Sequence, residues 1–264
     1  MQQFYIGATG MESYQTDLMN ITNNVSNAQT VGYKSSRVEY ENLFPKVFEQ
    51  VLQDSGYYDE SAPKPAAEIG SGVRISGVTK DLNQGTIQVT SKELDLAIEG
   101  NGFFQFQLPD GTMAYTRAGN LRKTAEGNLT DPNGHPLYPP ITIPSYAVKT
   151  TITAEGKVLV QDKIDSVGVE VGQITLTKFS NPSELKSIGQ NLFLQTASSG
   201  EPVTGIPSYD NTGALAQGAL EFSNVDVVSE MMRMVIVQRA FEIVSKMVQA
   251  GETMLRSATD IARS

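Results

Sequence analysis

The chain has 264 residues, a formal net charge of −9 and a hydrophobic fraction of 39%, which is enough apolar sequence to fold around a core. The acidic balance argues against nucleic acid as the main partner, because phosphate binding rewards clusters of Lys and Arg. The sequence has no cysteine, which excludes disulfides, thiolate nucleophiles and cysteine-ligated metals.

The N-terminal region carries a helical pattern. Its apolar and small residues recur at alternating steps of three and four: Phe4, Gly7, Met11, Tyr14, Leu18, Ile21, Val25 and Ala28. This a/d repeat predicts a helix that packs along another helix. We expect an N-terminal assembly helix over residues 1–32, because Gly32 suits a helix C-terminal turn. Its candidate interface residues are Met11, Tyr14, Leu18, Ile21 and Val25.

Asparagines lie on the more polar side of this predicted helix. Asn24 and Asn27 are candidates for polar contacts that set the register between assembled helices. The alternative, that they are simply solvated, stays open at this point.

The N-terminus does not have the pattern of a signal peptide. The first twenty residues carry Glu12 and Asp17 and no Lys or Arg, whereas a signal peptide has a basic start and a continuous apolar stretch. Apolar runs such as residues 234–237 are too short to span a bilayer. We therefore expect no membrane insertion. Any export would use a route that does not depend on a cleaved signal peptide.

Residues 33–72 predict a connector. The run from Tyr57 to Pro65 contains two prolines, and each proline biases the residue before it away from helix. We expect an extended segment here, between the first helix and the region that follows.

Residues 73–223 predict a β-rich outer domain. Turn signals recur at 101–102, 110–111, 118–119, 126–127 and 133–134, as in antiparallel hairpins. Strand-like runs lie between them, at 103–108, 113–117 and 120–124. Alternation changes phase at Gly172-Gln173, which predicts a β-bulge.

Residues 224–264 predict a second assembly helix. Asn224 and Asp226 offer capping side chains, and no proline follows up to residue 264. Such a helix would be roughly 60 Å long at about 1.5 Å per residue. Its candidate interface residues recur at helical spacing: Met231, Met234, Val237, Phe241, Val244, Val248 and Leu255.

The order helix, β domain, helix indicates an α+β fold. We expect the N- and C-terminal helices to form a coiled-coil-like terminal domain, with a mainly antiparallel β domain inserted between them. Two amphipathic helices cannot cover both seams on every side. The pattern therefore predicts a chain that assembles with further copies of itself.

No set of residues indicates catalysis, a cofactor or a metal site. The single histidine, His135, lies in a turn and is expected to face solvent, so a histidine-based triad or a multi-histidine metal site is not supported. Glu93 and Asp95 could imitate a glycosidase pair, but nothing indicates a cleft around them. We expect a non-enzymatic protein.

Motifs at both ends resemble those of the flagellar rod and hook family. At the N-terminal end they are residues 8–11, 23–27 and 30–34 (ATGM, NNVSN and TVGYK), and at the C-terminal end residues 223–226, 238–242 and 245–246 (SNVD, QRAFE and SK). In the middle, residues 96–104 and 115–119 (LAIEGNGFF and YTRAG) look like the β domain of the family. The resemblance covers nearly the whole chain, and the chain length favours a rod protein over a hook subunit.

The resemblance implies a structural role in the flagellar axis. It implies a helical homopolymer that contacts proximal rod and hook-side axial proteins and a surrounding ring bushing. It also implies passage through the flagellar type III export apparatus and assembly in the periplasm. Two alternatives stay open: another axial subunit of the same family, or a secreted binding module such as an adhesin.

Overall fold

The computed structural model describes residues 2–44, 46–48, 67–163, 168–209 and 211–261. The chain divides into two compact units. Unit 1 combines Met1–Asn23, Arg37–Val78 and Val228–Ser264, and unit 2 combines Asn24–Ser36 and Thr79–Val227. Each unit is thus assembled from segments that are far apart in the sequence.

Two long helices belong mainly to unit 1. Helix α1 spans Gln2–Ser26 and helix α2 spans Val227–Ile261. The capping residue predicted for the second helix, Asp226, directly precedes it. Helix α1 ends before Gly32, which has a φ of 69°. A Cβ on Gly32 would lie 2.6 Å from the Ala118 backbone nitrogen, so this close approach also requires glycine.

The strands of unit 1 pair in two sets. β1 (Ser36–Asn42) pairs with β4 (Val73–Lys80), and β2 (Lys46–Phe48) pairs antiparallel with β3 (Ala67–Ile69). Residues 33–72, expected to form a connector, thus include paired strands near both ends. The predicted extended run from Tyr57 to Pro65 lies outside the described residues.

Unit 2 is built from short strands. In the part of it that the structure describes, every strand pair with a defined register is antiparallel. The strands are β5 Ile87–Val89, β6 Leu96–Glu99, β7 Phe104–Gln107, β8 Met113–Thr116, β9 Arg122–Lys123, β10 Leu129–Thr130, β11 Lys149–Ile152, β12 Lys157–Gln161, β13 Val169–Gln173, β14 Leu176–Lys178, β15 Lys186–Gly189, β16 Leu192–Leu194, β17 Val203–Gly205, β18 Ala214–Gln217 and β19 Ala219–Glu221. A 3₁₀ turn spans Pro182–Glu184.

These strands form several small sheets. The four-stranded sheet has the order β15-β16-β8-β7, and the three-stranded sheet has the order β11-β12-β13. The remaining pairs in unit 2 are β18-β6, β19-β5, β14-β17 and β10-β9. The strands predicted at 103–108 and 113–117 are confirmed as β7 and β8, while only Arg122–Lys123 of the run 120–124 is a strand.

The predicted β-bulge lies within one residue of its expected position. Val158 pairs with Gly172, and Leu159 pairs with Glu170. Val171 is therefore the unpaired extra residue, which accounts for the change of phase read from the sequence.

The core of unit 2 lies on both sides of the β7 segment. Phe104 and Phe106 belong to the larger apolar cluster, and neither is exposed. Phe103 belongs to a second cluster with Phe179 and Phe193. Because successive side chains of a strand point to opposite faces, one short segment contributes to both clusters.

The expected fold class is confirmed. The chain is α+β, with mainly antiparallel strands, one N-terminal helix and one C-terminal helix. Within the described ranges, neither helix has an apolar stretch long enough to cross a bilayer.

Candidate assembly interface

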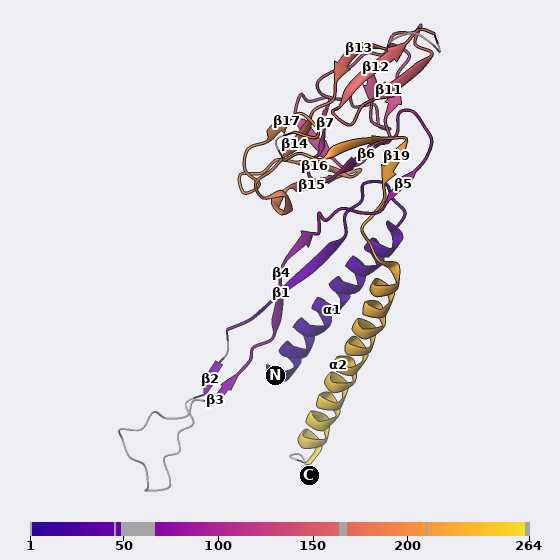
Figure 1. Cartoon of the computed structure of the whole chain (residues 1–264). Coiled ribbons are helices and arrows are strands. Elements are labelled where there is room, and N and C mark those ends of the chain that lie inside the picture. The colour runs from indigo at the N-terminus through magenta and orange to yellow at the C-terminus, as the bar shows by residue number, and fades with distance from the viewer. Residues whose placement is uncertain (1, 45, 49–66, 164–167, 210, 262–264) are drawn as a thin grey trace. The chain divides into compact units, whose positions relative to one another are not determined.

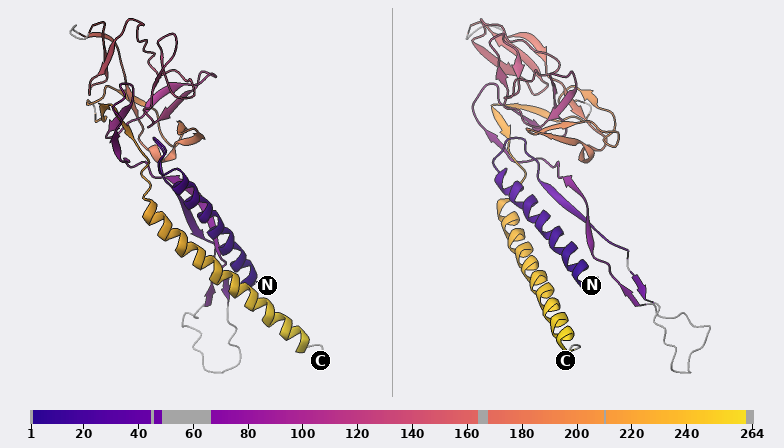
Figure 2. Two further views of the ribbon diagram at one scale, coloured as in Figure 1. Left: turned by 90° about the vertical axis from the view of Figure 1, so that its right-hand side faces the viewer. Right: turned by 180° about the vertical axis from the view of Figure 1, so that it is seen from behind.

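Helices α1 and α2 lie side by side in unit 1 (Figures 1 and 2). A Cβ on Gly7 would lie 2.5 Å from Val248 Cγ2. Nearer the other end of α1, Arg233 Nη2 donates to Asp17 Oδ1 at 2.7 Å. Residue numbers fall along α1 as they rise along α2, so the helices run antiparallel.

Helix α2 continues beyond the start of α1. A Cβ on Gly251 would lie 3.6 Å from the ring of Phe4, which is near the first residue of α1. The residues of α2 that follow extend past this contact (Figure 2). Leu255, a predicted interface residue, is accordingly 50% exposed.

The predicted seam of α1 is only half covered within the chain. Ile21 is fully buried, whereas the other four apolar candidates are half-buried: Met11, Tyr14, Leu18 and Val25. The buried positions around Ile21 are instead polar: Ser13, Asp17 and Asn24. At 3.6 residues per turn, this polar face lies roughly 100° around the helix from the seam.

The predicted seam of α2 faces α1. Val237 is buried, and the neighbouring candidates are half-buried: Met234, Phe241, Val244 and Val248. Met231, at the start of the helix, is 56% exposed. Helix α1 thus shields the middle of this seam, and both ends of it remain uncovered.

An ion pair joins the two helices, and a tyrosine hydrogen bond links that pair to β1. The Asp17 carboxylate is almost fully buried and pairs with Arg233. Burial, followed by the charge and hydrogen bond of Asp17, raises the pKa of Tyr40 to about 12. Tyr40 therefore keeps its proton and donates to Asp17. This contact joins three segments that are distant in sequence, and the helical periodicity gave no signal for it.

A second apolar stripe lies on α2, and the sequence analysis missed it. Its residues are all more than half exposed: Met232, Ile236, Ile243, Met247, Met254 and Ile261. Their spacing of four, seven, four, seven and seven places them within roughly 60° of one another on a helix. The signal was present as a second heptad repeat, hidden beside the stronger one. We call these six residues the outer stripe.

In unit 2, Glu221 is the centre of a buried polar cluster. Its Oε1 accepts from Lys34 Nζ at 2.6 Å and from the Gly85 amide at 2.9 Å. Its Oε2 lies 2.9 Å from Arg117 Nε. Its backbone carbonyl accepts from the Gly32 amide at 2.8 Å. One residue therefore connects the N-terminal segment, the β region and the strand that leads into α2.

Burial dominates the ionisation of these cations. Desolvation lowers the pKa of Lys34 and of Arg117, and the charge of Glu221 opposes the shift in both cases. The side chains of Lys34 and Glu221 are fully buried and that of Arg117 is 4% exposed. Removing the carboxylate would therefore leave two cations buried without a counter-charge.

Asn24 has a role inside the chain. Its Oδ1 accepts from Tyr33 Oη at 3.1 Å and from the Ser36 amide at 3.0 Å. Its Nδ2 donates to the Ser36 carbonyl at 2.8 Å. Asn24, a candidate for contacts between copies with a solvated position as the alternative, is thus buried and bonded within unit 2 in the single chain. Asn27 accepts from Thr30 Oγ1 at 3.2 Å and is half-buried.

The Asn224 side chain joins the segments that contain Ser35 and Asp81. Its Oδ1 accepts from the Ser35 amide at 2.8 Å, and its Nδ2 donates to the Asp81 carbonyl at 2.9 Å. The Asp81 amide in turn donates to the Ser35 carbonyl at 2.8 Å. The motif at residues 223–226 thus contacts, through the Asn224 side chain, the residue that directly follows the motif at 30–34.

His135 was expected to face solvent, but the structure shows it mostly buried. Its Nδ1 lies 2.9 Å from Asp131 Oδ2 and its side chain is 15% exposed. Asp131 Oδ1 also accepts from the amides of Asn133 and His135, so the turn folds around one carboxylate. Among the described residues, no group of three His, Asp or Glu side chains could hold a metal ion.

Two family models match the chain. The first, described as flagellar hook protein FlgE/F/G D1 domain, matches residues 97–160. The second, described as flagellar basal body rod FlgEFG protein C-terminal, matches residues 216–261. The matches thus cover part of unit 2 and all of α2.

Curated relatives match over almost the whole length. The flagellar basal-body rod protein FlgG of Borreliella burgdorferi is 37% identical over 266 residues, covering 100% of this chain and 99% of the relative. The protein of that name from Caulobacter vibrioides is 38% identical, covering 99% of each chain. That from Agrobacterium fabrum is 38% identical, covering 96% of this chain and 97% of the relative.

Proposed function

The chain belongs to the flagellar basal-body rod protein family, and we propose that it is a structural subunit of the distal rod. The subunit polymerises into a rigid, hollow axial filament that transmits torque from the motor to the hook. The observation that carries this proposal is the outer stripe on α2, which is apolar, long and uncovered in the single chain.

The energetics favour association through this stripe. Full burial of a large apolar side chain contributes roughly 1.5–3 kcal/mol. Six such side chains would contribute on the order of 10 kcal/mol before the costs of association. A monomer gains nothing from exposing them, whereas a helical polymer buries them in every subunit.

The half-covered seam of α1 offers a second surface. Met11, Tyr14, Leu18 and Val25 are half-buried in the single chain, so a helix of another copy can complete their burial. The terminal helices would then form a coiled-coil-like inner layer, as the heptad spacing predicts. In this arrangement residues 1–32 and 224–264 are the assembly segments and 73–223 the outer domain.

A head-to-tail contact that is repeated from copy to copy without closing a ring produces an open filament. Because α1 and α2 present different surfaces, a copy can bind one neighbour through each. The partners in this account are further copies, the proximal rod and hook-side axial proteins, and the surrounding ring bushing. Passage through the type III export apparatus would bring the subunit to the periplasm.

A second candidate is another axial subunit of the same family. A flagellar hook-basal body complex protein, FlhP, of Bacillus subtilis is 28% identical over 267 residues. One of the two family models is described as a hook protein domain and the other as part of a basal body rod protein. The distal rod is favoured because three full-length relatives named FlgG are 37–38% identical.

Genetic complementation tests the proposal. In a strain lacking this gene, we expect purified basal bodies to carry a rod that ends before the distal segment. Expression of the chain should restore full-length rods in electron micrographs. A deletion strain that builds complete rods and hooks would refute the assignment.

A further inference from the structure

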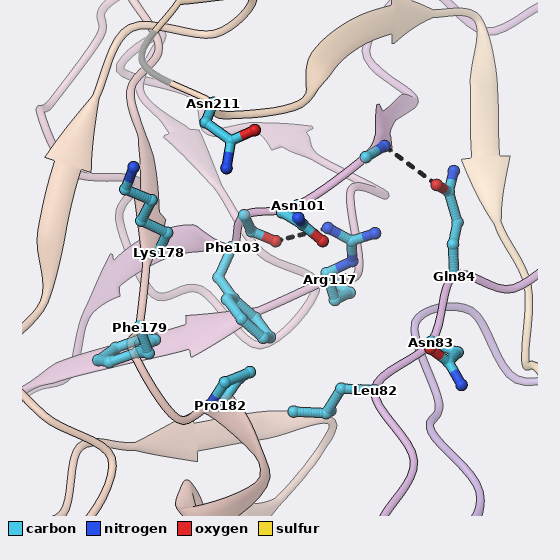
Figure 3. A pocket seen from close by; sticks show the side chains of 12 residues that line it. Leu82, Asn83, Gln84, Asn101, Phe103, Arg117, Lys178, Phe179, Pro182 and Asn211 are labelled. Atoms are coloured by element: carbon cyan, nitrogen blue, oxygen red, sulfur yellow. Dashed lines mark hydrogen bonds between the residues drawn. The ribbon is translucent and has the colours of Figure 1, made fainter.

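A cavity of about 350 Å³ opens in unit 2 beside the Glu221 cluster. Figure 3 shows its lining, which comes from the segment before β5, the turn before β7, strand β14 and the loop after β17. Neither the assembly helices nor the outer stripe contribute to it. The proposed function therefore leaves this cavity without a role.

Arg117 forms part of the lining and is 4% exposed. Its Nη1 donates to the Gly102 carbonyl at 2.6 Å, and its Nε pairs with Glu221. Within the described residues, Nη2 has no hydrogen-bond acceptor. A buried guanidinium with an unused donor favours a guest that brings an oxygen acceptor.

The rest of the lining is divided into an apolar and a polar part. Phe103 packs edge-on against Phe179, with ring centroids 6.0 Å apart, and these rings lie together in Figure 3. The carboxamides of Asn101 and Asn211 supply polar groups to the lining. In the part of the chain that the structure describes, neither carboxamide has a hydrogen-bond partner. Lys178 also lines the cavity (Figure 3).

The buried charges nearby are unbalanced. Two buried cations, Lys34 and Arg117, share the single buried carboxylate of Glu221; the charge of Asp81, an exposed residue, also acts on Lys34. The Lys80 ammonium is placed over the Tyr33 ring, 5.3 Å from its centroid, and over that of Phe193. Burial lowers the pKa of Lys80, and no carboxylate charge opposes this shift. The excess of cations favours an anionic guest.

We propose that this cavity receives a carboxylate-bearing turn of a second copy of the chain. Arg117 Nη2 and Lys178 bind the carboxylate, Asn101 and Asn211 bind the backbone of the turn, and Phe103 contacts an apolar neighbour. The inference rests on the proposed polymer, in which neighbouring copies are present at high effective concentration. The chain has a net charge of −9, so neighbouring copies carry many acidic side chains. This favours a turn of a second copy over a free ligand as the occupant of the cavity.

Site-directed photocrosslinking in the assembled full-length chain tests this inference. A benzophenone amino acid would replace Lys178 in the cavity, Ile243 in the outer stripe, or the exposed Lys186 on β15 as a control. We expect position 178 to crosslink in the polymer, but not in the monomer, to a peptide of a second copy that contains Asp or Glu.

The outcomes separate this inference from the proposed function. If position 243 crosslinks between copies and position 178 does not, the polymer exists and the cavity proposal is overturned. A crosslink from position 178 to glycan, or to the same copy only, also overturns it. If neither position crosslinks and no polymer forms, the proposed function itself fails.

Charge reversal gives a second readout. Lys178→Glu should raise the concentration at which filaments form by roughly tenfold, since a repelled carboxylate weakens the contact. Lys186→Glu adds the same charge change outside the cavity and should leave that concentration within about twofold. Equal effects of the two variants would count against a specific site.

Discussion

Glu221 is the residue on which most of the buried polar contacts in unit 2 depend. Its side chain is fully buried and receives Lys34, Arg117 and the Gly85 amide. Buried ion pairs add little net stability compared with apolar packing, yet breaking one is costly because the remaining charge stays buried. The cluster therefore acts as a strict requirement for the folded state.

The first prediction concerns this carboxylate. Glu221→Gln keeps the shape of the side chain but removes the counter-charge, so we expect a loss of about 3–5 kcal/mol in the free energy of unfolding. Urea denaturation of the full-length monomer measures it. The control is Glu201→Gln at an exposed position, which should change stability by less than about 0.5 kcal/mol. Equal effects would contradict the cluster.

The second prediction is a pH dependence at Tyr40. Its folded-state pKa of about 12 lies above the ordinary value of 10. Between these values the unfolded chain loses the phenol proton more readily than the folded chain, so stability falls as pH rises from 10 to 12. Tyr40→Phe should remove this part of the alkaline loss, as followed by helical circular dichroism. An unchanged alkaline transition in the variant would show that Tyr40 titrates normally.

At the scale of the element, helical periodicity predicted where the helices lie but only part of what they contact. The heptad pattern identified the residues of α2 that face α1, among them Val237 and Val248. It could not show that Asp17 and Asn24 would be buried, because their partners Arg233, Tyr40 and Ser36 come from other segments.

In the β region, turns and alternation predicted strands and a bulge, because these depend on neighbouring residues. The pairing of β18 with β6 depends on long-range packing and had no local signal. Likewise, the convergence of Lys34, Arg117 and Glu221 joins residues 187 positions apart in sequence. No periodic pattern records such a contact.

The third prediction tests the contact between the helices. Gly7→Ala would bring a methyl group within 2.5 Å of Val248 Cγ2, and the β-branched Val248 has little freedom to move. We expect a loss of roughly 1–3 kcal/mol in helix stability.

Gly10→Ala is the matched control, because no atom lies within 4 Å of its Cβ position. This variant should gain about 0.5–1 kcal/mol from helix propensity. Thermal melting at 222 nm compares the two variants. If Gly7→Ala is stabilised as much as Gly10→Ala, the close packing of α1 and α2 at this point is wrong.

At the scale of the whole molecule, apolar surface is distributed unevenly. The larger core of unit 2 is closed, with Leu96, Ile98 and Phe106 unexposed. On α2, by contrast, the six side chains of the outer stripe are more than half exposed, as are those of Val228, Met231 and Val235. Large exposed apolar surfaces mark interaction sites in soluble proteins. The apolar core of the β region is therefore closed within the single chain, whereas the apolar surface of α2 is not covered.

The most direct test of self-assembly through the helices is the filament-forming concentration of purified full-length chain, measured by sedimentation and electron microscopy. The comparison is between Ile243→Asp, in the outer stripe, and Gln249→Asp, which adds the same charge to an exposed position elsewhere on α2. We predict that the parent and Gln249→Asp form filaments, while Ile243→Asp remains monomeric with unchanged melting of its β region. Filaments formed equally well by Ile243→Asp, or a parent chain that stays monomeric at every concentration, would contradict the account.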